Sequence, residues 1–67
     1  MRHSVYRGCK FLFDSEDLRS ELAPVLKIRL KYGELQPGDC VISRVEIEGK
    51  WVIQEELAVN QFIHNYS

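Results

Sequence analysis

Apolar and polar side chains alternate most strictly over residues 26–32, a pattern typical of a half-buried β-strand. A helix is the alternative, because leucines also recur at helical spacing from Leu18 to Leu30. That helix would hold Arg29 within its apolar arc, so the pattern favours the strand. The strand would carry three cations on one face, about 6.7 Å apart along its axis: Lys27, Arg29 and Lys31.

A second alternating segment, residues 40–48, predicts another strand. Gly49 follows it and can supply the positive φ of a tight hairpin turn. Residues 50–54 would be the returning strand, which carries Trp51. A small core usually buries its tryptophan, so we expect Trp51 to be buried. An exposed Trp51 would instead be an anchor for an interface.

The two ends of the chain predict further elements. Residues 5–13 are rich in aromatic and branched side chains and predict a strand, in which Gly8 marks a bulge or a close backbone approach. Asp14 then stands where a helix N-cap is expected, and Pro24 would end that helix. Residues 55–66 predict a closing helix with its apolar side chains on one side.

Together these elements predict an α+β fold of order β-α-β-β-β-α, with the helices on one face of a mainly antiparallel sheet. The 67 residues suit a single domain over positions 1–67. Apolar residues make up 45 % of the chain and charged residues 28 %. These values are those of a globular protein, since disordered chains have fewer apolar residues and a higher net charge.

Charge and cysteine content bear on partners and location. The net charge of −1 balances nine Lys and Arg against ten Asp and Glu, whereas dedicated nucleic-acid binders usually show a clear basic excess. No apolar run approaches the ~18 residues that span a bilayer, and the N-terminal stretch lacks the apolar core of a signal peptide. We therefore expect a cytoplasmic protein in which Cys9 and Cys40 are reduced and mostly buried.

Little in the sequence points to catalysis. Cys9 with His3 or His64 is the only nucleophile–base candidate, and no local signature surrounds the cysteine. The same histidines with both cysteines have the wrong spacing for a zinc finger. The carboxylates at residues 14–17 and 55–56 suit helix starts better than acid–base work. We predict no catalytic residue, no metal and no cofactor.

A chain this small has little room for a water-excluded active site, which favours a binding module. We expect a small regulatory or adaptor protein that contacts a protein partner, and a homodimer would enlarge its core. The predicted partner-binding residues are the cations of the alternating strand and their neighbours: Lys27, Arg29, Lys31, Arg44, Lys50 and Trp51.

The same cations suit two alternative roles. In the first, a nucleic-acid-binding regulator sets its cations against phosphates. The net charge does not favour this alternative. In the second, the cations form a solvated face or protect a sheet edge from self-association. In the nucleic-acid-binding role, the cations that contact phosphates would be Lys27, Arg29, Lys31 and Arg44.

The ten residues Leu30–Asp39 resemble a short motif of GntR-type winged-helix regulators. In that motif a helix ends at the glycine, a leucine packs back, and Pro-Gly-Asp turns the chain. A recognition helix follows in that family, whereas here the alternating residues 40–48 and the hairpin at Gly49 follow. The likeness is confined to this segment, and no family is assigned to the whole chain.

Overall fold

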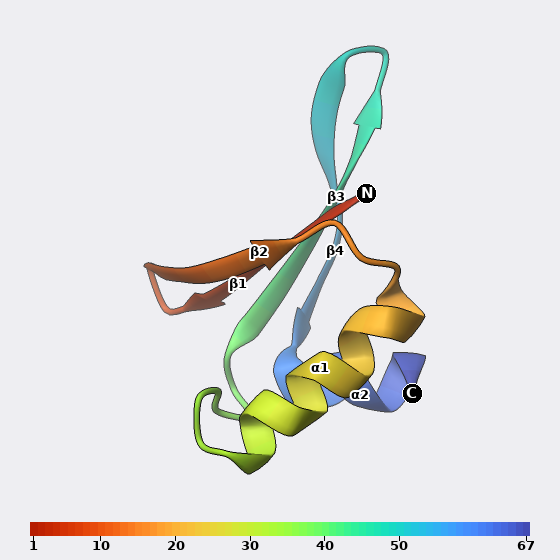
Figure 1. Ribbon diagram of the computed structural model, residues 1–67. Helices are drawn as coiled ribbons and strands as arrows, with labels where there is room; N and C mark the ends of the chain where they lie inside the picture. The colour runs from red at the N-terminus through yellow and green to blue at the C-terminus, as the bar shows by residue number, and fades with distance from the viewer.

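A computed structural model describes residues 1–67 as one four-stranded antiparallel sheet with two helices beneath it (Figure 1). The α+β class is confirmed. The predicted order β-α-β-β-β-α is corrected to β-β-α-β-β-α, and the strands lie in the order β2-β1-β3-β4. The elements are β1 (Arg2–Arg7), β2 (Lys10–Ser15), α1 (Arg19–Lys31), β3 (Cys40–Ile47), β4 (Lys50–Ala58) and α2 (Val59–Tyr66).

The first difference from the predicted order lies in residues 5–13, which span a hairpin and not one strand. Gly8 has φ 61° in the turn that joins β1 to β2. Glycine adopts this backbone conformation without the steric penalty of a Cβ, so the chain reverses there. Asp14 consequently lies on β2, opposite Ser4 of β1, and the prediction that it caps a helix is wrong.

The second difference is α1, because residues 26–32 are helical and not extended. Leu22 and Leu26 are buried on the same side of α1. They belong to the leucines that recur at helical spacing from Leu18 to Leu30. The prediction that Pro24 ends this helix is wrong too. Pro24 removes one helical hydrogen bond, the one to the carbonyl of Ser20. Both residues are exposed, so water can satisfy that carbonyl.

The end of α1 agrees with the local resemblance. Gly33 has φ 78° just after the helix, a left-handed conformation common at helix C-termini. The amides of Glu34 and Leu35 both donate to the carbonyl of Arg29, at 2.9 and 3.3 Å. The Leu35 side chain is buried in the core. A helix thus ends at the glycine, and a leucine packs back.

Asp39, the last residue of that segment, joins three elements. Its buried carboxylate accepts hydrogen bonds from Arg7 Nε at 3.0 Å, Arg7 Nη2 at 2.9 Å and the Gln36 amide at 2.9 Å. Its carbonyl accepts from the first amide of α2, Val59, at 2.6 Å. The hydrogen bonds from Arg7 hold the pKa of Asp39 below its usual value. Asp39 therefore fastens the loop before β3 to β1 and to α2.

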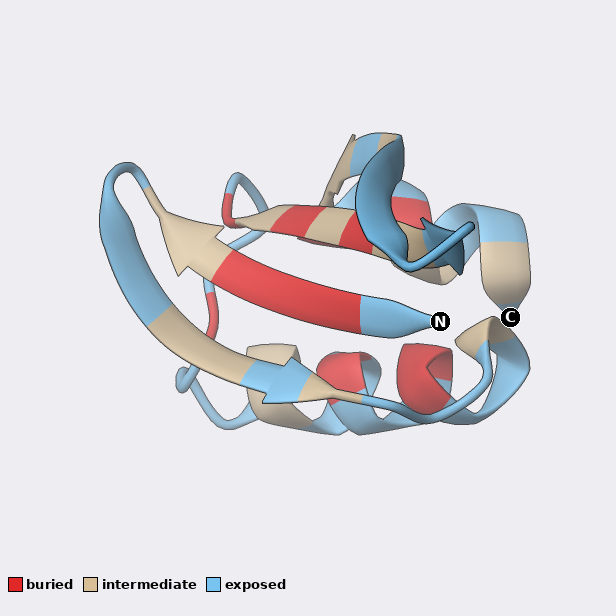
Figure 2. Ribbon diagram, turned by 90° about the horizontal axis from the view of Figure 1, so that it is seen from above, coloured by how far each residue is buried: buried red, intermediate tan, exposed pale blue.

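The hairpin of β3 and β4 is confirmed, with Gly49 at φ 77° in its turn. β4 continues as far as Ala58, so residues 55–56 belong to a strand and do not start a helix. The hairpin extends beyond the helices (Figure 1). Residues 46–54 are all exposed, as the pale blue tip in Figure 2 shows.

The core lies between the helices and one face of the sheet. A polar pair sits within it, in which His3 Nδ1 and Ser43 Oγ are 2.7 Å apart and both residues are buried. The middle of β1 is buried between its neighbours (Figure 2). No helix is both long and apolar enough to cross a membrane. The apolar core residues are Val5, Leu22, Ala23, Leu26, Leu35, Val41, Val59 and Phe62.

Candidate functional site

The sheet face turned away from the helices has no element packed over it (Figure 1). Side chains alternate along a strand, so the neighbours of the core residues point to this side. A hollow of about 400 Å³ opens there. We use the name open face for the seven residues that line it: Arg2, Ser4, Tyr6, Phe11, Asp14, Arg44 and Trp51.

Strand register brings these side chains together from four strands. Arg2 of β1 lies directly opposite Arg44 of β3. On the other side of β1, a bulge shifts the register after Val5, so that Tyr6 pairs with Phe11. The two rings meet edge to face with centroids 5.7 Å apart. A bulge commonly re-aims a side chain in this way, and here it places two aromatic rings at one end of the hollow.

The charges of the open face are only partly paired. Arg2 donates to Glu16 at 2.6 Å, which raises the pKa of Arg2 and lowers that of Glu16. Arg44 forms no ion pair and donates only to Ser4 Oγ, at 3.4 Å. Like charges directly opposite on neighbouring strands destabilise a sheet. The Arg2–Arg44 arrangement therefore does not serve stability.

Trp51 occupies the other end of the hollow. Its side chain is 50 % exposed, and the Arg2 guanidinium lies 5.7 Å from the ring centroid. The expectation of a buried tryptophan is wrong because Trp51 lies on the sheet face turned away from the helices, over which no element packs (Figure 1). Further large apolar side chains of the same hairpin are exposed as well: Ile47, Val52 and Ile53.

The structure separates the six residues predicted to bind a partner. Arg44 and Trp51 line the hollow, and Lys50 is exposed beside Trp51 on β4. The other three predicted residues lie on α1, on the other side of the sheet, because residues 26–32 are helical. These are Lys27, Arg29 and Lys31. One of these cations lies over an aromatic ring instead, with the Arg29 guanidinium 4.0 Å from the Phe13 centroid.

Sequence reasoning missed five residues of the open face, all in the first two strands. The signal that could have found them is Gly8. A hairpin turn at that position brings Tyr6 and Phe11 side by side, whereas one continuous strand places them on opposite faces. The five residues are Arg2, Ser4, Tyr6, Phe11 and Asp14.

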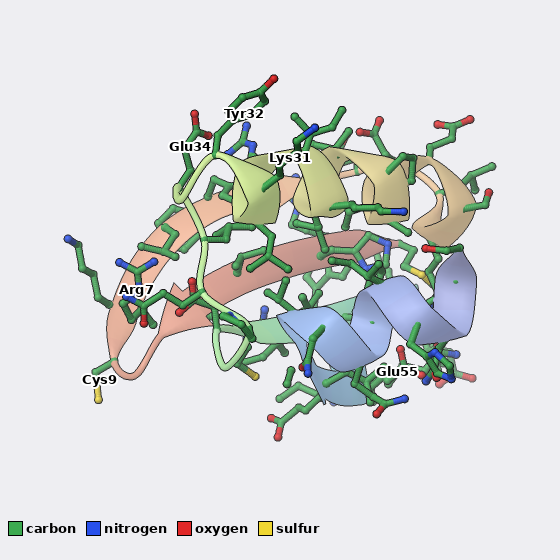
Figure 3. All side chains as sticks on the ribbon, turned by 90° about the horizontal axis from the view of Figure 1, so that it is seen from below. Arg7, Cys9, Lys31, Tyr32, Glu34 and Glu55 are labelled. Carbon is green, nitrogen blue, oxygen red and sulfur yellow. The ribbon has the colours of Figure 1, made fainter.

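Cys9 and His3 lie too far apart to act as a nucleophile–base pair. Cys9 is exposed in the β1–β2 turn and points away from the body (Figure 3), which contradicts its expected burial. His3 lies buried near the opposite end of the strand, about 20 Å away by strand rise. Cys40 is half-buried, and burial raises the pKa of its thiol. No three His, Cys, Asp or Glu side chains are grouped to hold a metal ion.

No family model, curated protein or solved structure matches the chain. Function is consequently inferred from the chemistry of the open face. Uncovered aromatic rings can stack on planar or apolar groups, and guanidinium groups pair with carboxylates in a bidentate geometry. The arrangement is that of a surface able to bind a partner with apolar and anionic groups side by side.

Proposed function

We propose that this protein is a small regulatory or adaptor module that binds a protein partner through the open face and catalyses no reaction. The observation that carries this proposal is the exposed Trp51 with two arginines around the one hollow of the surface. Tryptophan, tyrosine and arginine are the residues most enriched at the centres of protein interfaces. We place the protein in the cytoplasm.

The charges on this face favour a protein over a polyanion. Asp14 lines the hollow, and Arg2 already pairs with Glu16, so the face has no large positive excess. Two charges of opposite sign stay without an ion pair, those of Asp14 and Arg44. A partner carboxylate beside an apolar side chain would satisfy Arg44 and cover Trp51 together. A second copy of the chain would also bury the exposed hairpin, so a homodimer remains part of the proposal.

The experiment compares partners captured from the source cells by the wild type and by variants of the open face. Arg44→Glu reverses the charge of the unpaired arginine, and Trp51→Ser removes the exposed ring. Lys10→Glu and Leu18→Ser are matched controls, because both positions are exposed outside the hollow. We expect at least one protein to be retained by the wild type and both controls and lost with both open-face variants. Capture that is equal for all five proteins would contradict the proposal.

A single-stranded nucleic acid is the second candidate partner. The specific observation in its favour is that Tyr6, Phe11 and Trp51 line the hollow together with two arginines. Bases stack on such aromatic side chains, and arginines contact phosphates. Lys27, Arg29 and Lys31 do not join this surface, since they lie on α1. Of the four cations predicted to contact nucleic acid, only Arg44 lies on the open face.

Fluorescent single-stranded DNA and RNA, titrated at low and at high salt, test the second candidate. Phosphate contacts release counterions, so a nucleic-acid interface would weaken steeply as salt is added. Binding that disappears with Trp51→Ser would favour nucleic acid over protein. An absence of binding at low salt would remove this candidate.

A further inference from the structure

α1 presents an apolar ridge to solvent, on the side of the molecule away from the open face. Val25, Ile28 and Tyr32 are 37, 56 and 73 % exposed. They are spaced i, i+3 and i+7, so they form one stripe along the helix. Tyr32 projects outward from the end of α1 with Glu34 beside it (Figure 3). We call these three side chains the α1 ridge.

Neither helix propensity nor core packing accounts for the α1 ridge. β-branched residues such as Val25 and Ile28 favour helices less than unbranched ones do, because χ1 is restricted against the preceding turn. Burial accounts for them only in part, since Ile28 is 56 % exposed and the core contacts of α1 are made through Leu22 and Leu26. Single exposed apolar residues are ordinary, but an aligned row of three is typical of a contact surface.

Two exposed lysines flank the ridge on one side. Lys27 and Lys31 are one helical turn apart and form this row, whereas Arg29, on the other side, is half-buried with its guanidinium over the Phe13 ring. None of the three forms an ion pair within the chain. Lysines near a helix C-terminus interact favourably with the helix dipole, but that role leaves the outward charge of Lys27 and Lys31 free. The surface is thus an apolar stripe beside a row of two unpaired lysines.

We propose that the α1 ridge binds an acidic amphipathic helix of a partner protein. Its apolar face would cover the α1 ridge, and its carboxylates would pair with Lys27 and Lys31 beside it. An apolar helix face laid against a complementary groove or stripe is a recurring mode of recognition. The proposal rests on charge complementarity at α1 and does not depend on the open face. With both surfaces occupied, the protein would bridge two partners.

An anionic membrane is the less favoured occupant. Glu21 and Glu34 bracket the α1 ridge, one near each end, and anionic lipid headgroups would repel them. Only three apolar side chains could enter the headgroup region, because the other side of α1 is fixed in the core. A helix of a partner can instead place its carboxylates beside the cations and avoid the two glutamates.

The first test selects peptides from a displayed random library on the immobilised protein. A counter-selection uses the double variant Lys27→Glu/Lys31→Glu. We expect the wild type to enrich peptides in which carboxylates accompany apolar residues at helical spacing. Their affinity should fall at least about tenfold for the double variant. The matched control Lys10→Glu/Lys50→Glu carries the same charge change away from α1 and should bind like the wild type. Circular dichroism verifies that both double variants fold.

The second test maps a selected peptide on the 15N-labelled protein by chemical-shift perturbation. We expect the changes to centre on residues 25–32 and Ile28→Ser to weaken binding. The proposal is overturned if the enriched peptides lack acidic residues, if none is enriched, or if the perturbations lie on the open face. Binding of phosphatidylserine vesicles through residues 25–32, with no peptide binding there, would assign the ridge to a membrane and likewise overturn it.

Discussion

The two faces of the sheet differ although the same strands build them. On the covered face, Val5 and Val41 are almost fully buried and pack against both helices. On the open face, Tyr6 and Arg44 alternate with them along the same strands and line a hollow. In the middle of β1 and β3, alternate residues thus pack in the core, and we propose that residues between them contact a partner. Stability and binding should therefore be separable residue by residue.

The largest effect should come from the covered face. Phe62 is fully buried between α2 and the sheet. Truncation to alanine leaves a cavity and should cost about 3–5 kcal/mol, enough to unfold much of a small protein. The free energy of unfolding is measured by urea denaturation followed by circular dichroism. Leu18→Ala, at an exposed position, is the control. A cost below about 1 kcal/mol for Phe62→Ala would contradict the assignment of the core.

A smaller loss is expected at Asp39, which fastens the end of the covered face. Asp39→Asn removes the charge that Arg7 binds and should cost about 2 kcal/mol, less than in a fully buried pair because Arg7 is partly exposed. The lowered pKa of Asp39 means that its contribution is complete above the usual carboxyl pKa of about 3.9 and is lost as pH falls through the lower folded-state pKa.

Urea titrations at several pH values check this prediction. In the wild type, the free energy of unfolding should decline at acidic pH, and Asp39→Asn should remove part of that decline. Asp14→Asn is the matched control, since Asp14 is exposed on the open face. If the two variants behave alike, the tie between Asp39 and Arg7 does not stabilise the fold.

His3 gives the covered face a second pH dependence. Burial lowers its pKa, with Arg19 and the N-terminus acting in the same direction, while the Asp17 carbonyl and Glu55 oppose them. The folded protein thus favours neutral His3. Its contribution to stability is complete above the unfolded-state pKa of about 6.5 and declines as pH falls below it, by at most about 1.4 kcal/mol per pH unit.

The check is the free energy of unfolding between neutral pH and the onset of carboxylate titration. His3→Gln keeps a group that can hydrogen-bond to Ser43 and should flatten the profile in this range. A wild-type profile that is already flat would show that His3 is accessible to protons, against its burial. His64→Gln is the control, because His64 is exposed on α2.

The smallest effect is expected on the open face. Arg44→Gln removes the charge opposite Arg2 and should change the free energy of unfolding by less than about 0.5 kcal/mol, toward higher stability. Thermal unfolding of the two proteins side by side measures it. A loss above about 1 kcal/mol would mean that Arg44 stabilises the fold, and the contrast between the two faces would fail.

The sequence predicted the fold class and the second hairpin because those features follow from local patterns. Strict alternation over residues 40–48 and a glycine at the turn leave few alternatives. The alternation over residues 26–32 led to the wrong prediction of a strand, although leucines at helical spacing were present in the same stretch. Burial of Leu22 and Leu26 against the sheet decides for the helix, and local alternation contains no information on that tertiary contact.

The open face was predicted only at Arg44 and Trp51. Its remaining residues depend on strand order and register, which place β1 between β2 and β3. The exposure of Trp51 was missed for a related reason. Whether Trp51 is buried depends on the sheet face on which it lies and on the face that the helices cover, and both follow from strand register and packing and not from local sequence. In the GntR-type motif that residues 30–39 resemble, a helix likewise ends at the glycine, here Gly33.

The central claim is that the open face stays uncovered until a partner binds it. Trp51 is the only tryptophan of the chain, so 5-fluorotryptophan gives a single 19F resonance from the middle of that surface. In the free protein the resonance should show the solvent isotope shift of an exposed ring. On addition of the partner isolated by capture, it should move and lose that shift. A ring already shielded in the free protein, or one that stays equally accessible in the complex, would contradict the account.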